Sequence, residues 1–175
     1  MRRLCLLFLL IGTYCYAGER KYTVDSPDGK IQLAIIQTDA GELTYQLSVK
    51  RKQVIDASAL GFKTEDGLTF PFRGWKMGKV TRNKVNSVWK PLWGKRAVVP
   101  DKYNEMKLSF VNEAKSSDAL EVVARAYNEG VAFRYVSPQD AGSALELTTF
   151  NFAGDYTAWF YNGERHNIGP ERLTE

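Results

Sequence analysis

The final stretch of the sequence, WFYNGERHNIGPERLTE, concentrates residue types that could recognise a carbohydrate. Flat aromatic rings can cover the apolar C–H face of a sugar ring, while amide and carboxylate groups bond to its hydroxyls. Five residues are therefore candidates for substrate binding or for contacts between domains, namely Trp159, Tyr161, Asn162, Glu164 and His166.

His166 is the single histidine of the chain, and the sequence offers it no catalytic partner. There is no G-x-S-x-G nucleophile elbow and no glycine-rich phosphate loop, and one histidine cannot form a two-histidine metal site. A solvated loop histidine is the commoner case. Carboxylates are plentiful, but strands of a sandwich bring distant residues together, so spacing alone selects no glycosidase-type pair. The residues by themselves thus predict no catalytic side chain and no metal ligand.

A second group of rings lies between Ser87 and Leu108, where Trp89, Trp93 and Tyr103 stand among prolines, a glycine and charged residues. This combination also suits a sugar surface. The alternative is that these tryptophans, like Trp159 of the final stretch, fill the core of the fold and a seam between domains. Both interpretations stay open at this point.

The segments that must position these residues alternate apolar and polar side chains with the period of two that is typical of β-strands. Turn-forming sequences such as SPDGK, DAGE and YNEG separate them. Residues 116–127 favour a strand because they contain a β-branched pair and precede a turn, with a short helix as the alternative. The pattern predicts an all-β fold, a large antiparallel β-sandwich of two packed sheets.

The amino terminus has the features of a signal peptide over residues 1–17. MRR supplies positive charge, LCLLFLLIGTY supplies the apolar run, and Cys15 and Ala17 are the small residues before the cleavage point. A membrane anchor is disfavoured because the apolar run is well short of the ~20 residues that a spanning helix needs. Acylation of Cys15 is disfavoured because the bulky Tyr14 precedes it. We therefore expect an exported protein.

Removal of the signal peptide changes what the composition implies. Both cysteines, Cys5 and Cys15, would leave, so the domain over residues 18–175 has no disulfide. Arg2 and Arg3 would leave too, so 24 basic residues become 22 against 20 acidic ones, and the formal charge falls from +4 to +2. The cations are scattered along the chain, so no nucleic-acid partner is expected, nor a membrane association after cleavage.

Two ordered motifs carry a resemblance to a known family. WGKRAVVPDKYNE (93–105) is close to W-G-x-R followed by Y-N-E, and RAYNEGVAFRY (125–135) is close to R-A-Y-x-x-G-V-A-F-R-Y. Together with the strand and turn sequences around them, they make most of residues 18–175 resemble the amino-terminal domain of glycoside hydrolase family 97. This family includes exported α-glucosidases and α-galactosidases.

The resemblance implies a supersandwich of the galactose-mutarotase type, packed on a (β/α)8 catalytic barrel that follows it in the chain. It also implies a periplasmic enzyme that cleaves α-linked oligosaccharides, with inversion through a glutamate base or with retention through an aspartate nucleophile. A calcium ion held by glutamates is expected in the full-length enzyme, in line with the oxygen ligands that calcium prefers.

The sequence departs from the family in the motifs that carry the chemistry. The family's acid and its base or nucleophile lie on the barrel, and the calcium-binding glutamate of the sandwich lies in an H-E-A-type motif. The only histidine-containing motif here is GERHNIGPE. No catalytic residue and no calcium ligand is carried over, so we expect this chain alone to be inactive and its sandwich to be incomplete at the C-terminal end.

Two other functions remain as alternatives. One is a stand-alone carbohydrate-binding module that uses Trp89, Trp93, Trp159 or Tyr161 as a stacking platform. The other is a structural interaction domain whose rings form a seam for another protein surface.

Overall fold

The computed structural model describes residues 19–65, 67, 69–71, 75–113, 119–137, 142–161 and 167–173. Every regular element in this part of the chain is a strand, which confirms the all-β prediction. The described residues contain no helix that could cross a membrane. The strands are β1 (Arg20–Asp25), β2 (Ile31–Gln37), β3 (Leu43–Val49), β4 (Lys52–Leu60), β5 (Phe62–Thr64), β6 (Thr69–Phe70), β7 (Trp75–Trp89), β8 (Val99–Asn112), β9 (Ala119–Tyr127), β10 (Val131–Val136), β11 (Ala144–Glu146), β12 (Thr157–Tyr161) and β13 (Asn167–Arg172).

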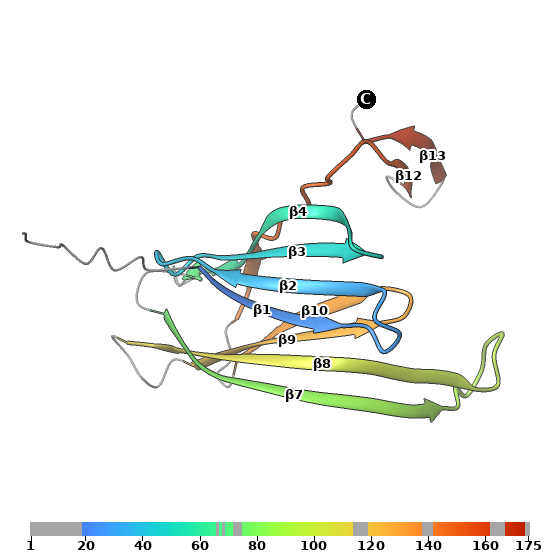
Figure 1. Cartoon of the computed structure of the whole chain (residues 1–175), viewed down its shortest axis with the longest axis horizontal. Coiled ribbons are helices and arrows are strands. Elements are labelled where there is room, and N and C mark those ends of the chain that lie inside the picture. The colour runs from blue at the N-terminus through green and yellow to red at the C-terminus, as the bar shows by residue number, and fades with distance from the viewer. Residues whose placement is uncertain are drawn as a thin grey trace, which may run out of the picture.

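Two four-stranded antiparallel sheets form the body of the molecule (Figure 1). One has the strand order β1-β2-β3-β4 and the other β10-β9-β8-β7. Strands that follow one another in the sequence pair in space, as short turns between antiparallel strands require. The first sheet lies on the second, with β1 and β2 in contact with β8 and β9. This arrangement is the predicted sandwich.

The inner faces of the two sheets bury the residues that the alternation assigned to one face. Leu33 and Ile35 on β2 are fully buried, and so are Met106 and Leu108 on β8. Lys107, which lies between the last two, points to the outer face and pairs with a carboxylate there. Successive side chains of a strand point to opposite faces, so one polar–apolar alternation builds both the core and the surface.

One end of the core is a cluster of aromatic rings around Phe70, which is fully buried. The Phe70 ring centroid lies 5.3 Å from those of Trp75 and Phe110, 5.7 Å from that of Phe62 and 6.0 Å from that of Tyr135. These rings come from β5, β6, β7, β8 and β10. The cluster therefore joins the small sheet β11-β5-β6 to the second large sheet.

Strand β9 decides between the strand and the short helix that residues 116–127 could form. Residues 119–127 are extended, so the strand prediction is confirmed there and the short-helix alternative is wrong. Residues 116–118 lie outside the described part of the chain. Strand β9 pairs with β8 on one side and β10 on the other. Two partners satisfy the backbone groups of this strand through the sheet.

Residues 147–153 continue β11 along the outer edge of β4. The Leu147 N–H donates to the Gly61 carbonyl at 2.8 Å, and the Ala153 N–H donates to the Val54 carbonyl at 3.0 Å. The segment thus runs antiparallel to β4 and extends the first sheet by one irregular strand.

A β-bulge interrupts β4 beside this edge segment. The register between β3 and β4 shifts after Tyr45 and again after Leu47, and each shift leaves an extra residue on β4. The buried Ser58 bridges the irregularity, because its Oγ accepts from the Asn151 N–H at 2.9 Å and donates to the Asp56 carbonyl at 2.8 Å. The bulge is therefore held from the edge segment as well as from within β4.

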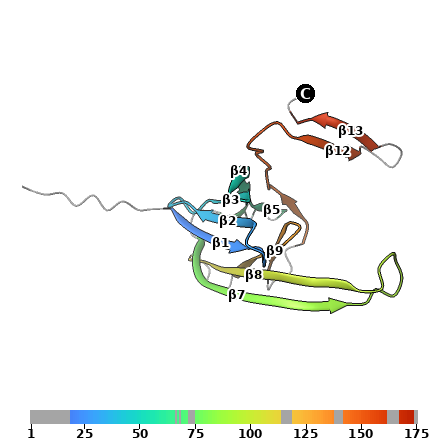
Figure 2. The ribbon, with the colours of Figure 1, turned by 45° about the vertical axis from the view of Figure 1, so that its right-hand side comes forward.

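The hairpin of β7 and β8 extends beyond the rest of the sandwich as a two-stranded arm (Figures 1 and 2). Cross-strand pairing continues to its outer end, where Trp89 lies opposite Val99. Residues 90–98 connect the two strands. We call residues 88–98 the hairpin tip.

The tryptophans that the sequence singled out lie at the surface. The exposed fraction is 54% for Trp89, 87% for Trp93 and 69% for Trp159. The interpretation that these three rings fill the sandwich core is therefore wrong. Trp75, which had not been singled out, is the tryptophan that packs in the core.

Candidate functional site

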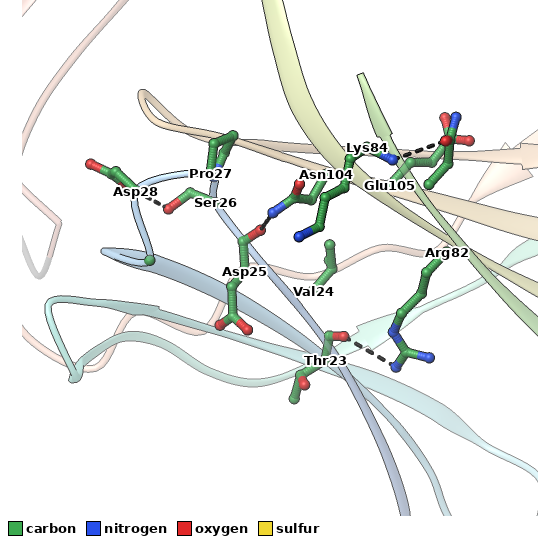
Figure 3. Close-up of a pocket in the computed structure, with 12 residues that line it drawn as sticks. Thr23, Val24, Asp25, Ser26, Pro27, Asp28, Arg82, Lys84, Asn104 and Glu105 are labelled. Atoms are coloured by element: carbon green, nitrogen blue, oxygen red, sulfur yellow. Dashed lines mark hydrogen bonds between the residues drawn. The ribbon is translucent and has the colours of Figure 1, made fainter. Parts of the chain in front are cut away.

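A polar cleft of about 780 Å³ lies where the turn between β1 and β2 meets the long β7–β8 hairpin (Figure 3). Both strands of the hairpin and the end of β1 contribute side chains to it. Its charged and amide-bearing lining residues are Asp25, Asp28, Arg82, Asn83, Lys84, Asn104 and Glu105.

The β1–β2 turn folds around the side chain of Asp28. One Asp28 oxygen accepts from the Ser26 hydroxyl at 2.7 Å and from the Lys30 N–H at 3.1 Å, and the other pairs with the Lys30 ammonium at 2.9 Å. Gly29 has a φ of 71°, a conformation that glycine adopts without steric cost. The sequence SPDGK therefore gives a tight turn that holds one wall of the cleft in place.

Side chains from the second sheet cross to the backbone of β1. Asn104 Nδ2 donates to the Asp25 carbonyl at 2.7 Å, and Arg82 Nη2 donates to the Thr23 carbonyl at 3.4 Å (Figure 3). These bonds use carbonyl groups of β1, an edge strand of the first sheet. They fix the width of the cleft between the two sheets.

The two motifs that carry the family resemblance pair with each other beside this cleft. Glu105 lies opposite Arg125, and Tyr103 lies opposite Tyr127, in the register of β8 and β9. Arg125 Nε donates to Glu105 Oε2 at 2.8 Å, and the Arg125 guanidinium lies 4.2 Å from the centre of the Tyr103 ring. The sequence order conceals this contact because 20 residues separate Glu105 from Arg125.

The carboxylates that line the cleft are each engaged in structural bonds. Asp25 accepts from Gln32 at 2.8 Å, Asp28 is held within its own turn, and Glu105 is paired with Arg125. General acid–base hydrolysis of a glycoside needs two carboxyl groups placed on either side of the scissile bond. The cleft instead offers a mixed polar wall with hydrogen-bond donors and acceptors.

The described residues contain no group of three or more His, Cys, Asp or Glu side chains that could hold a metal ion. The donor set that calcium prefers is therefore not assembled in this part of the chain. We derive no step through calcium from these residues.

Acidification should weaken the β1–β2 turn. Hydrogen bonds from Ser26 and from Lys30 lower the pKa of Asp28 from 3.8 to about 2. Because this pKa is depressed in the folded state, the stabilisation is complete above pH 3.8 and is lost as the pH falls through about 2. Urea unfolding at a series of pH values should show a shallower acid dependence for Asp28→Asn than for the original chain. Equal dependence in both proteins would contradict this role of Asp28.

Loss of the Arg125 side chain should destabilise the region where the two motifs meet. We expect Arg125→Met to lower the free energy of unfolding by about 1–2 kcal/mol, because it leaves the Glu105 carboxylate without its charged donor. Arg125→Lys should recover only part of this, since an ammonium cannot reproduce the planar group over Tyr103. Urea denaturation measures the free energy of unfolding of both variants.

The pair of Lys107 and Glu121, at 3.0 Å on the same sheet, provides the control. It is more exposed than the Arg125–Glu105 pair, so Lys107→Met should cost less than about 1 kcal/mol. Equal losses for Arg125→Met and Lys107→Met would contradict a special role for the motif contact.

Two of the residues predicted from the final stretch lie away from the cleft. Trp159 and Tyr161 are on β12, and their exposed fractions are 69% and 70%. The β12–β13 hairpin stands away from the sandwich beyond β4, far from the β7–β8 arm in both views (Figures 1 and 2). Asn162, Glu164 and His166 lie outside the described residues. The structure thus does not bring Trp159 and Tyr161 to the cleft.

The sequence carries signals for parts of the cleft but does not identify it as a site. SPDGK predicts a turn, and Y-N-E is part of a family motif. Asn104 was nevertheless within that motif, so the motif itself was the usable signal. Arg82 and Asp25 belong to no local pattern and become neighbours of Asn104 only through the packing of the sheets.

Residues 24–175 match the family model described as Glycosyl-hydrolase 97 N-terminal. This chain belongs to glycoside hydrolase family 97. The match covers both motifs, the cleft and the β12–β13 hairpin, so the resemblance drawn from the motifs is confirmed. The chain corresponds to the amino-terminal part of family 97 enzymes.

The curated relatives extend far beyond the matched part. A retaining alpha-galactosidase of Bacteroides thetaiotaomicron is 22% identical over 190 residues, which cover 97% of this chain and 27% of that protein. A probable retaining alpha-galactosidase of Streptomyces bingchenggensis is 29% identical over 166 residues, which cover 91% of this chain and 26% of that protein. The chain thus spans about a quarter of the length of these relatives.

Solved structures of similar proteins share the fold. An enzyme of this family from Pseudoalteromonas sp. strain K8, solved in complexes with panose and with acarbose, superposes with a TM-score of 0.69 at 34% identity. The alignment covers 81% of this chain and 22% of that enzyme. A beta-arabinopyranosidase superposes with a TM-score of 0.65 at 26% identity, over 79% of this chain and 22% of that protein.

Proposed function

We propose that this family 97 chain is the amino-terminal sandwich of an exported α-glycosidase that packs on a (β/α)8 catalytic barrel and helps to wall its active site. The observation that carries the proposal is the family match over residues 24–175 combined with relatives about four times as long. In this proposal the sandwich supplies a rigid support, and the barrel supplies the catalytic carboxylates.

The proposed substrate is an α-linked oligosaccharide. Support comes from two relatives that carry the name retaining alpha-galactosidase and from an enzyme solved with panose and acarbose. The carboxylates of the polar cleft are all used in structural bonds, which fits a supporting domain better than a hydrolytic one. We accordingly propose that this chain alone does not hydrolyse glycosides.

The proposal includes export through the signal peptide at residues 1–17, cleavage before Gly18, and a periplasmic location. Its support is the charged start, the apolar run and the small residues at the cleavage point. The proposal also includes a calcium ion in the complete enzyme, held by oxygen ligands such as glutamates.

The test begins with the coding DNA beyond codon 175. We expect an in-frame region that encodes a barrel, and its product should hydrolyse p-nitrophenyl α-galactoside or α-glucoside. The 175-residue chain assayed in parallel should be inactive. A complete product without α-glycosidase activity, or hydrolysis by the shorter chain alone, would overturn the proposal.

A stand-alone carbohydrate-binding module is the second candidate. The exposure of Trp89, Trp93, Trp159 and Tyr161 favours it, because a stacking platform needs accessible rings. Calorimetry of the chain with maltooligosaccharides and with α-galactosides distinguishes the two functions. Binding heat that disappears in Trp93→Ala would favour the module, and the absence of heat with every sugar would exclude it.

A further inference from the structure

The hairpin tip, residues 88–98, presents an unusual amount of apolar surface to solvent. Leu92 is 99% exposed and Trp93 is 87% exposed, and Val88, Trp89 and Val98 are exposed as well. Single exposed apolar residues are common, but five large ones within eleven residues, at the end of β7 and in the turn after it, are a concentration of the kind that marks an interaction site.

The β7 strand of this arm and the tip are strongly basic. Between Trp75 and Pro100 the sequence has seven cations and no Asp or Glu, namely Lys76, Lys79, Arg82, Lys84, Lys90, Lys95 and Arg96. Lys90, Lys95 and Arg96 lie in the tip itself and form no ion pair with the described residues. This segment is a local exception to the scattered cations expected from the whole chain, and it favours an acidic partner.

The tip is held in position by its two strands. Backbone pairing continues from Val80 opposite Leu108 to Trp89 opposite Val99, so it extends into the first two residues of the tip. The base of the arm is anchored to the sandwich through Arg82 and Asn104, which bond to β1. A surface that is already ordered loses little conformational entropy when a partner binds.

We infer that the hairpin tip docks on the carboxylate-rich mouth of the catalytic domain of the same enzyme, with the Trp93 ring as its central anchor. The inference rests on the proposed function, because it needs the catalytic domain. The mouth of a glycosidase site carries at least a pair of Asp or Glu residues, whose negative charge complements the three cations of the tip. Most of the length of the relatives lies outside the part that this chain matches, so their polypeptides are long enough to supply a surface for the tip.

Hydrogen exchange provides the test, with the complete enzyme and the 175-residue chain measured side by side. In the complete enzyme we expect amides of residues 88–98 to exchange about tenfold or more slowly than in the shorter chain. Trp93→Ala should remove that protection and raise KM for oligosaccharides several-fold. Lys90→Gln combined with Lys95→Gln and Arg96→Gln should also remove that protection and raise KM. This triple variant should in addition reduce the salt dependence of KM.

Trp159→Ala is the matched control, because Trp159 is also an exposed tryptophan but lies on β12. It should leave exchange at the hairpin tip unchanged. Since the tip residues are solvent-exposed, their variants should keep the urea midpoint of the original chain, which separates lost docking from lost folding.

The outcomes distinguish the inference from the function on which it rests. An active enzyme whose tip exchanges as fast as in the shorter chain would overturn the inference and leave the proposed function intact. A complete product without hydrolase activity would overturn both. Co-sedimentation of the shorter chain with phosphatidylglycerol vesicles, lost in Trp93→Ala, would assign the tip to anionic lipid instead. Concentration-dependent dimers lost in Trp93→Ala would assign it to a second copy.

Discussion

Phe70→Ala should lower the free energy of unfolding by about 3–5 kcal/mol, the usual range for removing a fully buried phenylalanine. The Phe70 ring is fully buried, and four other rings surround it with centroids between 5.3 and 6.0 Å away. Alanine would leave a cavity that these rings cannot fill without giving up their own packing. The loss should be large because Phe70 connects the small sheet to the second large sheet.

Urea denaturation followed by tryptophan fluorescence measures this effect, since buried Trp75 lies in edge contact with Phe70. Phe160→Ala is the control, because Phe160 is 47% exposed on β12 and should cost less than about 1 kcal/mol. Similar losses for the two variants would show that the ring cluster does not stabilise the sandwich as we describe.

Gly61→Ala should cost about 2–3 kcal/mol, because it overpacks a site formed by backbone atoms. A Cβ at position 61 would lie 2.4 Å from the Phe70 carbonyl oxygen and 3.1 Å from Pro71 Cδ. The carbonyl cannot move away easily, since Phe62 and Phe70 pair across β5 and β6. A shift of Gly61 would also disturb the bond that its carbonyl accepts from the Leu147 N–H.

Gly130→Ala is the matched control for this substitution. Nothing lies within 4 Å of a Cβ at position 130. Gly130→Ala should therefore change the urea midpoint little, while Gly61→Ala should lower it clearly. If both variants unfold at the midpoint of the original chain, the close approach of Gly61 to Phe70 is not as described.

The strands were predictable because their signal is local. The alternation of Met106, Leu108 and Phe110 specifies which side chains of β8 enter the core, and these three are buried as expected. The same holds for Leu33 and Ile35 on β2. A period of two needs no knowledge of the partner strand, so the sequence alone identifies both the strand and its buried face.

The exposure of the tryptophans was not predictable, since it depends on how far a strand extends past its neighbours. Trp75 and Trp89 stand at the two ends of β7, yet one is buried and the other is more than half exposed. Only the part of β7 that lies against the first sheet has a core to enter. The type of residue at a position does not indicate how far its strand extends past the neighbouring strands.

The candidate cleft was hidden for a related reason. Asp25 and Asn104 are ordinary polar residues in their local sequence, and their contact joins positions 79 residues apart. It exists because β1 lies at the edge of one sheet and faces β8 of the other. Family motifs gave the nearest signal, because they identified Tyr103, Glu105 and Arg125 before their contact was known.

The edge segment beside β4 has a consequence for biosynthesis. Ser58 receives its bond from Asn151, 93 positions later in the chain. During translation β4 leaves the ribosome long before the segment that covers its edge and seals its bulge. Until then the strand presents unpaired backbone groups, the state in which nascent chains join wrong neighbours. The order of synthesis thus makes β4 a strand of the first sheet whose outer edge stays unpaired until residues 147–153 have been made.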